Sequence, residues 1–333
     1  MPKVTVIVPN YNHARFLTQR IESILAQTYQ DFELLYLDDA STDNSAEVFA
    51  AYASNPHVRA ILNTQNTGSP FIQWNRGVRE ARGEYIWIAE ADDYADPRLL
   101  ETLVAKLDTH PGVGMAYCQS LVVDEQSKVL FSTAQWTQPL NPTHWEKDYV
   151  NNGRDECRRF LVQDNTVPNV SAVLFRKSVY EQAGGADEGM RACGDWLLYA
   201  NIMLKSDVAF VSEPLNFFRQ HTLSVTHTSG WNGLLLKEGY QVVDFIVRHV
   251  QVDAHVLRLS CKMRMGDWRR VMLSSQNCIP WRRNVVIYRI ARRVDMLLHL
   301  RLAKLLLAVA ARAVLSSVRP ASTSPRTAGN VEQ

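Results

Sequence analysis

Residues 83–97 read GEYIWIAEADDYADP, an apolar segment followed by four carboxylates within seven positions. The apolar part, residues 85–89, has the aromatic and β-branched content of a buried strand. Pro97 fits the first turn of a helix extending to about residue 110, so Asp96 before it is a helix cap. The other three carboxylates lie where a buried strand ends, and charge there is costly without a partner.

The segments around this stretch alternate between strand-like and helix-like patterns. Predicted strands cover residues 4–8, 32–37, 58–62 and 85–89, and predicted helices cover residues 15–27 and 72–81, with another after Ser41. Strands that alternate with helices form βαβ units, which build a mainly parallel sheet covered on both faces. We therefore expect an α/β fold with a Rossmann-like sheet flanked by helices.

The second half of the chain is less regular and then becomes helical. After a strand at 112–124, residues 132–169 form a long irregular stretch, typical of a binding loop, with a helix near 156–162. Further elements are predicted at 170–175 (strand), 177–183 and 195–204 (helices), 208–218 (extended), and 234–250, 252–274 and 285–318 (long helices). We expect an α/β domain at 1–229, a helical region at 230–318 and a disordered polar tail at 319–333.

Charge is distributed unevenly along the chain. The net charge is +2, but residues 251–333 contain 15 Lys and Arg against 4 Asp and Glu, so the preceding part is acidic. Arg282, Arg289 and Arg293 recur at helical spacing beside apolar residues, which predicts an amphipathic basic helix. Such a helix either lies on an anionic membrane surface or packs on the protein with a solvated basic face. Nucleic acid is disfavoured because no recognition module is present.

Cysteine use and the apolar runs indicate a compartment. The five cysteines have no CxxC spacing, which argues against a disulfide framework or a zinc site. The first residues lack a signal-peptide core, and no apolar run approaches the roughly 20 residues of a membrane-spanning helix. We expect a cytoplasmic protein, with peripheral attachment to the inner face of the membrane as an additional expectation.

Two acidic clusters follow predicted parallel strands. Asp38 and Asp39 end the second strand and residues 90–93 follow the fourth, so both clusters are expected to face one crevice. Carboxylates held together favour a cation between them, and oxygen ligands favour Mg²⁺ or Mn²⁺ bridged to a nucleotide diphosphate. An Asp-Asp pair at a strand end is also a common turn and helix cap, and the residues alone leave both readings open.

An ordered set of motifs carries a resemblance. VTVIVPNYNHARFLTQRIESILAQTYQDFELLYLDDASTDNS, followed by NTG and NRGVREARGEYIWIAEADDYADP, resembles the amino-terminal part of family 2 glycosyltransferases. The likeness covers about residues 3–124 and continues more loosely to about 227. It implies a GT-A fold and an inverting, Mn²⁺- or Mg²⁺-dependent transfer of a sugar from a nucleotide-diphosphate donor.

The resemblance implies a nucleotide site near the amino terminus. Pro9, Tyr11 and Asn12 would lie along the base, with Tyr11 against the ring. Asp39 would accept a hydrogen bond from the imide nitrogen of uracil or thymine, which implies a UDP-sugar or dTDP-sugar. Arg76 partly replaces an arginine that many members carry earlier in this helix, where this chain has Gln-Trp-Asn; we expect Trp74 to pack within the fold.

The acidic motif carries further implied roles. Asp93 matches the carboxylate that binds the cation, Asp92 the one nearer the ribose or sugar, and Glu90 the first acidic position of the motif. In the segment FFRQHTLS, His221 matches a metal or diphosphate ligand. Arg219 and Ser224 are candidate donor contacts.

Inverting transfer also requires a base that removes a proton from the acceptor hydroxyl. By resemblance this base is Asp195, in RACGDWLLYANIML, where Gly194 replaces the acidic residue that usually precedes it. Asp195 is also placed to cap the helix, and one residue is able to serve both purposes.

The resemblance implies an enzyme that moves a sugar to a glycan or lipid-linked acceptor in surface polysaccharide synthesis. Gly194 and Trp74 depart from the family motifs, so a noncatalytic scaffold with the same fold is an alternative. A sugar nucleotidyltransferase is a second alternative, although PNYNHARF lacks the Gly-rich basic signature of that class. No GxGxxG follows the first strand, which disfavours a Rossmann oxidoreductase.

Overall fold

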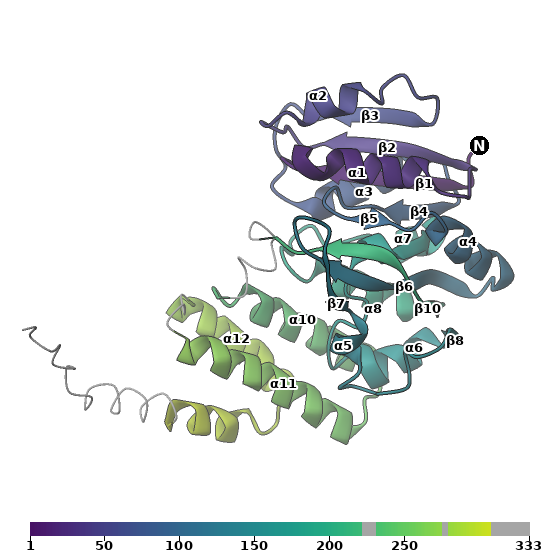
Figure 1. Cartoon of the computed structure of the whole chain (residues 1–333). Coiled ribbons are helices and arrows are strands. Elements are labelled where there is room, and N and C mark those ends of the chain that lie inside the picture. The colour runs from purple at the N-terminus through teal and green to yellow at the C-terminus, as the bar shows by residue number, and fades with distance from the viewer. Residues whose placement is uncertain (222–230, 275–278, 308–333) are drawn as a thin grey trace, which may run out of the picture.

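A computed structural model describes residues 1–221, 231–274 and 279–307 (Figure 1). The strands are β1 (Val4–Asn10), β2 (Phe32–Asp38), β3 (Val58–Leu62), β4 (Tyr85–Ile88), β5 (Tyr94–Ala95), β6 (Val113–Val123), β7 (Val129–Ser132), β8 (Tyr149–Asn151), β9 (Val173–Arg176) and β10 (Asp207–Arg219). The helices are α1 (Ala14–Leu25), α2 (Ser45–Ala50), α3 (Pro70–Glu80), α4 (Leu99–Thr109), α5 (Ala134–Thr137), α6 (Gly153–Glu156), α7 (Lys177–Gln182), α8 (Gly194–Met203), α10 (Leu234–His249), α11 (Ala254–Leu273) and α12 (Trp281–Val294).

The strands form one sheet in the order β3-β2-β1-β4-β9-β6-β10-β5, with β7 on β6 and β8 on β10. The pairings among β3, β2, β1 and β4 and the long β6–β10 pairing are parallel. Strand β9 is antiparallel to both neighbours. The predicted α/β fold with a mainly parallel sheet and a helical carboxyl-terminal region is confirmed.

Alternation along the strands divides the core between the two faces of the sheet. In β1, Val4, Val6 and Val8 pack with α1, α2 and α4, whereas Ile7 packs on the other side with α3 and α8. This period of two is the pattern of a strand buried on both faces. Full burial of each such side chain contributes about 1.5–3 kcal/mol, so this core holds the strand ends that carry the site in place.

Helix α3 packs very close to β1 because residue 77 is glycine. A Cβ atom built at Gly77 would lie 2.5 Å from Cγ2 of Ile7. This close approach brings the first turns of α3, with Gln73 and Trp74, toward the ends of β2 and β4.

Two predicted elements differ in the structure. The predicted strand at 170–175 begins with a 3₁₀ turn at Val170–Ala172, because the Asn169 side chain accepts a hydrogen bond from the Ser171 amide. The prediction of a single helix at 285–318 was wrong, because α12 ends at Val294 and residues 298–307 form another helical segment.

Asp295 accounts for the break after α12. Its carboxylate accepts a hydrogen bond from the Leu297 amide at 3.0 Å, and Arg301 pairs with it at 3.1 Å. The side chain thereby satisfies backbone at the start of the following segment, as an amino-terminal cap does. Residues 308–318, in the remainder of the predicted helix, lie outside the described residues.

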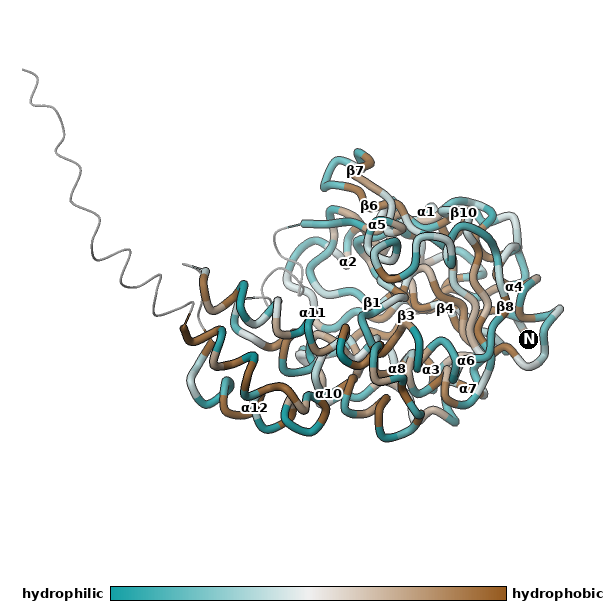
Figure 2. The backbone as a smooth tube through the Cα atoms, turned by 90° about the horizontal axis from the view of Figure 1, so that it is seen from below, coloured by the Kyte–Doolittle hydropathy of each residue, from teal (hydrophilic) through white to brown (hydrophobic). Residues whose placement is uncertain are grey.

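The helical region packs against the α/β part rather than standing apart. Ile287, Ile290, Ala291 and Val294 of α12 are buried in the same core cluster that contains α8 and α10. Apolar and polar residues alternate along α12 (Figure 2); the apolar residues of the core cluster are buried and most of its arginines are exposed. The apolar side of this basic segment therefore packs on the protein, and contact of its exposed basic side with a membrane stays a prediction. The predicted boundary at 229/230 and the tail at 319–333 fall on or beside undescribed residues, so they stay predictions.

Candidate active site

The two acidic clusters come together at one edge of the sheet. Strand β1 lies between β2 and β4 and is parallel to both, so the carboxyl ends of all three strands meet. The Asp39 amide donates to the carbonyl of Asn10 at 2.9 Å, and the Ala89 amide donates to that of Ile7 at 2.8 Å. The segments after β2 and β4 therefore flank the end of β1.

Asp93 is the most deeply buried carboxylate of the second cluster. Its side chain is 1% exposed and accepts hydrogen bonds from Asn169 Nδ2 at 2.9 Å, Ser171 Oγ at 2.6 Å and the Arg219 amide at 2.9 Å. Burial, together with the charge of Asp92, raises the pKa of Asp93 to about 6. Both oxygens of Asp93 thus already have protein partners, and Asp93 joins the acidic motif to the segment before β9 and to the end of β10.

Asp92 is more accessible and faces two imidazoles. Its Oδ2 lies 2.9 Å from Nε2 of His221, and one ligand atom from each of His13, Asp92 and His221 lies within 4.8 Å of the others. Burial alone would raise the pKa of Asp92, but the His221 hydrogen bond and the two imidazoles hold it below its usual value. Ser224 lies outside the described residues.

Glu90 is the third carboxylate of the cluster. The Trp74 indole N–H donates to its Oε1 at 2.7 Å, and the Trp74 ring packs edge-on against Phe71. Trp74 is buried, which agrees with the predicted packing role. Burial and the charge of Asp92 raise the pKa of Glu90 to about 8.

Two buried arginines lie beneath the acidic cluster. Arg20 Nε donates to the Glu90 carbonyl at 2.7 Å, while its Nη1 and Nη2 have no hydrogen-bond partner among the described residues. Arg219 donates to the Asp92 carbonyl, the Asp124 carbonyl, Gln19 and Ser127, and its side chain is 2% exposed. A donor contact by Arg219 would require breaking these bonds, so the geometry favours a supporting role.

Asp39 is engaged by the loop between β3 and α3. Its carboxylate accepts hydrogen bonds from Asn63 Nδ2 at 2.7 Å, Gln73 Nε2 at 2.8 Å and Thr67 Oγ1 at 2.8 Å. The predicted bond to a nucleotide base would replace one of these. Arg76 donates to the Asn63 side-chain oxygen, so it supports the same loop.

The segment after β1 is joined to the segment after β2. Asn12 has a left-handed backbone (φ 60°), and its Oδ1 accepts from the Thr42 amide at 2.7 Å. Asp38 accepts from the Ser41 amide at 2.9 Å, as expected for the turn reading of the Asp-Asp pair. Pro9 is buried in β1, whereas the Tyr11 side chain is 45% exposed and free to meet a ligand.

Asp195 lies in the first turn of α8. Its Oδ2 accepts a hydrogen bond from Asn165 Nδ2 at 2.9 Å. Burial raises the pKa of Asp195 to about 6, although bonds from the Trp196 amide and Asn165 act in the opposite direction. The N-cap position is Cys193 rather than Asp195, so the predicted cap role is not observed.

A family model described as "Glycosyl transferase family 2" matches residues 5–182, more than half of the chain. The chain belongs to glycosyl transferase family 2. GlyG of Streptococcus pneumoniae is 39% identical over 100 residues, which are 30% of this chain and 33% of GlyG. The match thus covers about a third of the length of GlyG.

Solved structures agree with the GT-A fold of this family 2 chain. TarS of Staphylococcus aureus, named a poly(ribitol-phosphate) beta-N-acetylglucosaminyltransferase, is 30% identical over 43% of this chain and 27% of TarS. Its structure with UDP-GlcNAc superposes with a TM-score of 0.62 at 15% identity over 88% of each chain. A Pyrobaculum calidifontis mannosyltransferase with GDP-Man and Mn²⁺ gives 0.55 at 18% identity, over 96% of this chain and 81% of that one.

The Gly194 departure from the family motif has a packing explanation. A Cβ atom at residue 194 would lie 2.5 Å from the Phe71 ring, so this aromatic side chain occupies the space next to Asp195. An acidic side chain at this position, directly before the candidate base Asp195, is therefore excluded sterically in this family 2 chain.

Sequence reasoning missed Glu238 of α10, which supports the Asp195 segment. Its buried carboxylate accepts hydrogen bonds from the amides of Arg191, Ala192 and Cys193 at 3.2, 2.8 and 2.9 Å. The sequence around Glu238 does not indicate this contact, because the contact depends on how α10 packs against α8 in the folded protein. His13 and Arg20 were missed for the same reason.

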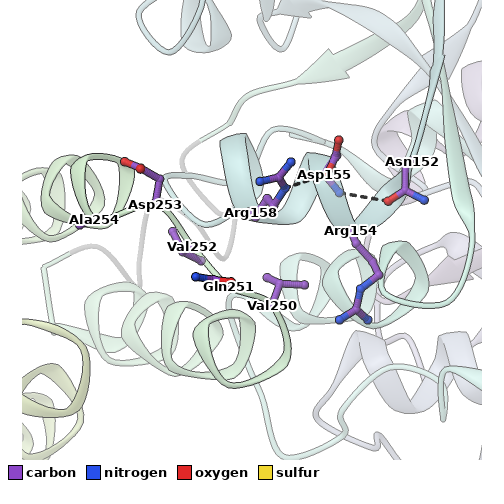
Figure 3. A pocket seen from close by; sticks show the side chains of 9 residues that line it. All are labelled: Asn152, Arg154, Asp155, Arg158, Val250, Gln251, Val252, Asp253 and Ala254. Atoms are coloured by element: carbon purple, nitrogen blue, oxygen red, sulfur yellow. Dashed lines mark hydrogen bonds and ion pairs between the residues drawn. The ribbon is translucent and has the colours of Figure 1, made fainter.

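A separate hollow of about 740 Å³ lies between the α6 region and the segment joining α10 to α11 (Figure 3). Arg154 donates to the His249 carbonyl at 2.6 Å, and Arg158 pairs with Asp155 at 2.7 Å. None of the candidate site residues lines this hollow, so it is separate from the candidate active site.

Proposed function

We propose that this family 2 protein is an inverting, cation-dependent glycosyltransferase that takes a sugar from a UDP-sugar or dTDP-sugar donor. The observation that carries the proposal is the pair formed by Asp92, at the carboxyl end of β4, and the buried His221, after β10, whose Oδ2 and Nε2 atoms lie 2.9 Å apart. A carboxylate and an imidazole are ligands of divalent first-row metals, which accompany nucleotide diphosphates.

The donor set fits a divalent cation. His221 Nδ1 is buried without a hydrogen-bond partner among the described residues, so its ring is oriented through Nε2, the atom that faces Asp92. In this proposal Asp92 and His221 hold the cation and Asp93 supports them from below, so the cation-binding role expected for Asp93 passes to Asp92. When bound, Mn²⁺ or Mg²⁺ would stabilise the negative charge of the departing diphosphate.

Asp195 is the proposed general base. Its carboxylate would take the proton from the acceptor hydroxyl while that oxygen bonds to the anomeric carbon, and the bond from this carbon to the diphosphate oxygen breaks. A pKa of about 6 leaves Asp195 ionised at neutral pH but more basic than an exposed aspartate. Asn165 orients it through a hydrogen bond at 2.9 Å.

The acceptor side of the proposal is a glycan or lipid-linked glycan in surface polysaccharide synthesis. TarS, by its name, acts on poly(ribitol-phosphate), which supports a surface polymer as the class of acceptor. The irregular region between β7 and β9 approaches the base through Asn165 and is the proposed acceptor-binding segment.

Calorimetric titration of UDP, dTDP, GDP and ADP, with Mn²⁺ and with chelator, tests the donor site. We expect Mn²⁺-dependent binding of UDP or dTDP that is lost in Asp92→Asn, because that substitution removes the ionised ligand. Asp93→Asn keeps hydrogen-bonding groups toward Asn169 and Ser171 and is expected to retain part of the binding. Loss only in Asp93→Asn would restore the role first expected for that residue. Absence of nucleotide binding to wild type would contradict the enzyme and favour the scaffold.

We also propose that the exposed basic side of α12 approaches an anionic membrane surface, which would place a cytoplasmic enzyme near lipid-linked acceptors. Within residues 1–221, 231–274 and 279–307, no helix is both long and apolar enough to cross a bilayer. Arg282, Arg289 and Arg292 are exposed on α12. Each arginine near an anionic surface contributes about 1 kcal/mol, and salt weakens the attraction.

Co-sedimentation with phosphatidylglycerol vesicles and phosphatidylcholine vesicles tests this surface. We expect binding to the anionic vesicles alone, weakened by salt and reduced at least about tenfold when Arg282, Arg289 and Arg292 become Gln.

The matched control removes the same charge elsewhere, by changing the exposed Arg79, Arg158 and Arg270 to Gln. An equal loss in both variants would show that net charge, and not the α12 surface, determines binding.

A further inference from the structure

His13 had no role assigned from the sequence, yet its imidazole reaches the proposed cation site. One ligand atom from each of His13, Asp92 and His221 lies within 4.8 Å of the others. The His13 and His221 ring centroids are 5.8 Å apart, with the rings inclined at 71°. The three side chains come from the β1–α1 turn, the end of β4 and the segment after β10, so the fold itself brings them together.

The backbone around His13 is held on both sides. The preceding residue, Asn12, accepts amide hydrogen bonds from Thr42 at 2.7 Å and Asp43 at 3.2 Å. The following residue, Ala14, donates its amide to Asp43 at 3.0 Å. Because the backbone on both sides of His13 is already held in place, only the His13 side chain has to be ordered when a ligand binds, as in a preorganised site.

The spacing of the three groups suits an octahedral cation. Two adjacent ligands at about 2.1 Å from an ion lie about 3.0 Å apart, and two opposite ligands about 4.2 Å apart. The Asp92–His221 separation of 2.9 Å matches an adjacent pair. The 4.8 Å limit on the whole set requires only a small side-chain adjustment for His13 to join them.

We propose that His13 is a third protein ligand of this cation and that the resulting set selects a transition ion such as Mn²⁺ over Mg²⁺. The inference rests on the proposed function, since it concerns the same cation. Two imidazoles and one carboxylate are typical ligands of divalent first-row transition ions, whereas Mg²⁺ binds mainly oxygen atoms and retains its waters. His13 therefore determines which ion the enzyme uses.

Electron paramagnetic resonance of Mn²⁺ tests this directly, in the presence of UDP and with Mg²⁺ as a competitor. Loss of even an indirect partner of a metal ligand costs about 10- to 100-fold in affinity. We therefore expect His13→Asn to weaken Mn²⁺ binding at least about tenfold, with a smaller change for Mg²⁺. Spin-echo spectra should show one fewer nitrogen coupling than wild type.

Two further variants separate ligation from general damage. His13→Asp supplies an oxygen ligand and is expected to bind metal again, with its preference moved toward Mg²⁺. His110→Asn, at the end of α4 and outside the cluster, should behave as wild type. Unchanged Mn²⁺ affinity, metal preference and nitrogen couplings in His13→Asn would overturn the inference while leaving the proposed function intact. Failure of wild type to bind Mn²⁺ with UDP would instead contradict the proposed function.

Discussion

Asp195→Asn is expected to lower the turnover number by about 10²- to 10⁴-fold, because the variant lacks the carboxylate proposed to remove the acceptor proton. Nucleotide and cation binding should remain as in wild type, since the proposed donor ligands come from β1, β4 and the segment after β10. The amide still accepts a hydrogen bond from Asn165, whose Nδ2 lies 2.9 Å from the carboxylate in the native chain. Steady-state kinetics together with UDP calorimetry measure the two effects separately.

The pH profile gives this prediction an independent test. The pKa of Asp195 is raised to about 6, so wild-type turnover should fall as pH decreases through 6 and the base becomes protonated. The residual turnover of Asp195→Asn should lack this acidic limb. Asn201→Asp is the control, because it makes the reverse exchange, of an amide for a carboxylate, elsewhere on α8. If Asp195→Asn retained full turnover, another residue would be the base.

The strand ends were predictable because their signal is local. The apolar run of β4 and the carboxylates after it are consecutive in sequence, and parallel strands bring consecutive βα units to one edge of a sheet. The roles of Asp92 and Asp93 were not predictable in this way. Which aspartate is buried depends on Asn169, Ser171 and the Arg219 amide, all of which are distant in sequence.

The same limit applies to the helical region. The periodicity of α12 correctly indicated an amphipathic helix, but a buried apolar side and a membrane-facing apolar side have the same pattern. Packing of Ile287 and Ala291 into the core decides between them, and it depends on where α10 lies. The role of Glu238, which supports the Asp195 segment from α10, was not predictable from the sequence for the same reason.

Glu90→Gln is expected to stabilise the metal-free protein at alkaline pH. Burial and the Asp92 charge raise the pKa of Glu90 from 4.5 to about 8, so the folded state binds this proton more tightly than the unfolded state. The free energy of unfolding should therefore fall as pH rises from about 4.5 to about 8. At 1.36 kcal/mol per pKa unit the shift corresponds to about 4–5 kcal/mol; allowing for partial exposure, we expect a gain of at least about 2 kcal/mol above pH 8.

The native carboxylate is then a cost to stability that the proposed cation would offset. Chemical denaturation of Glu90→Gln and wild type across pH measures the gain, which should disappear below about pH 4.5, where Glu90 is protonated in both states. Adding Mn²⁺ and UDP should reduce the advantage of the variant, because only wild type carries the ionised Glu90 carboxylate whose repulsion the nearby cation would relieve. The Gln oxygen can still accept the Trp74 indole hydrogen bond, so packing is preserved.

Glu33→Gln is the matched control with the opposite sign. Glu33 is also buried, and burial favours its neutral form, but hydrogen bonds from Thr5, the Arg82 amide and Arg59 hold its pKa below the usual value. Its ionised form therefore stabilises the fold above pH 4.5, and this contribution is lost as pH falls through the lower folded-state pKa. Glu33→Gln should destabilise at pH 8, where Glu90→Gln stabilises. If both substitutions shift stability in the same direction, carboxylate repulsion in the β4 cluster does not determine the pH dependence, and the Glu90 argument fails.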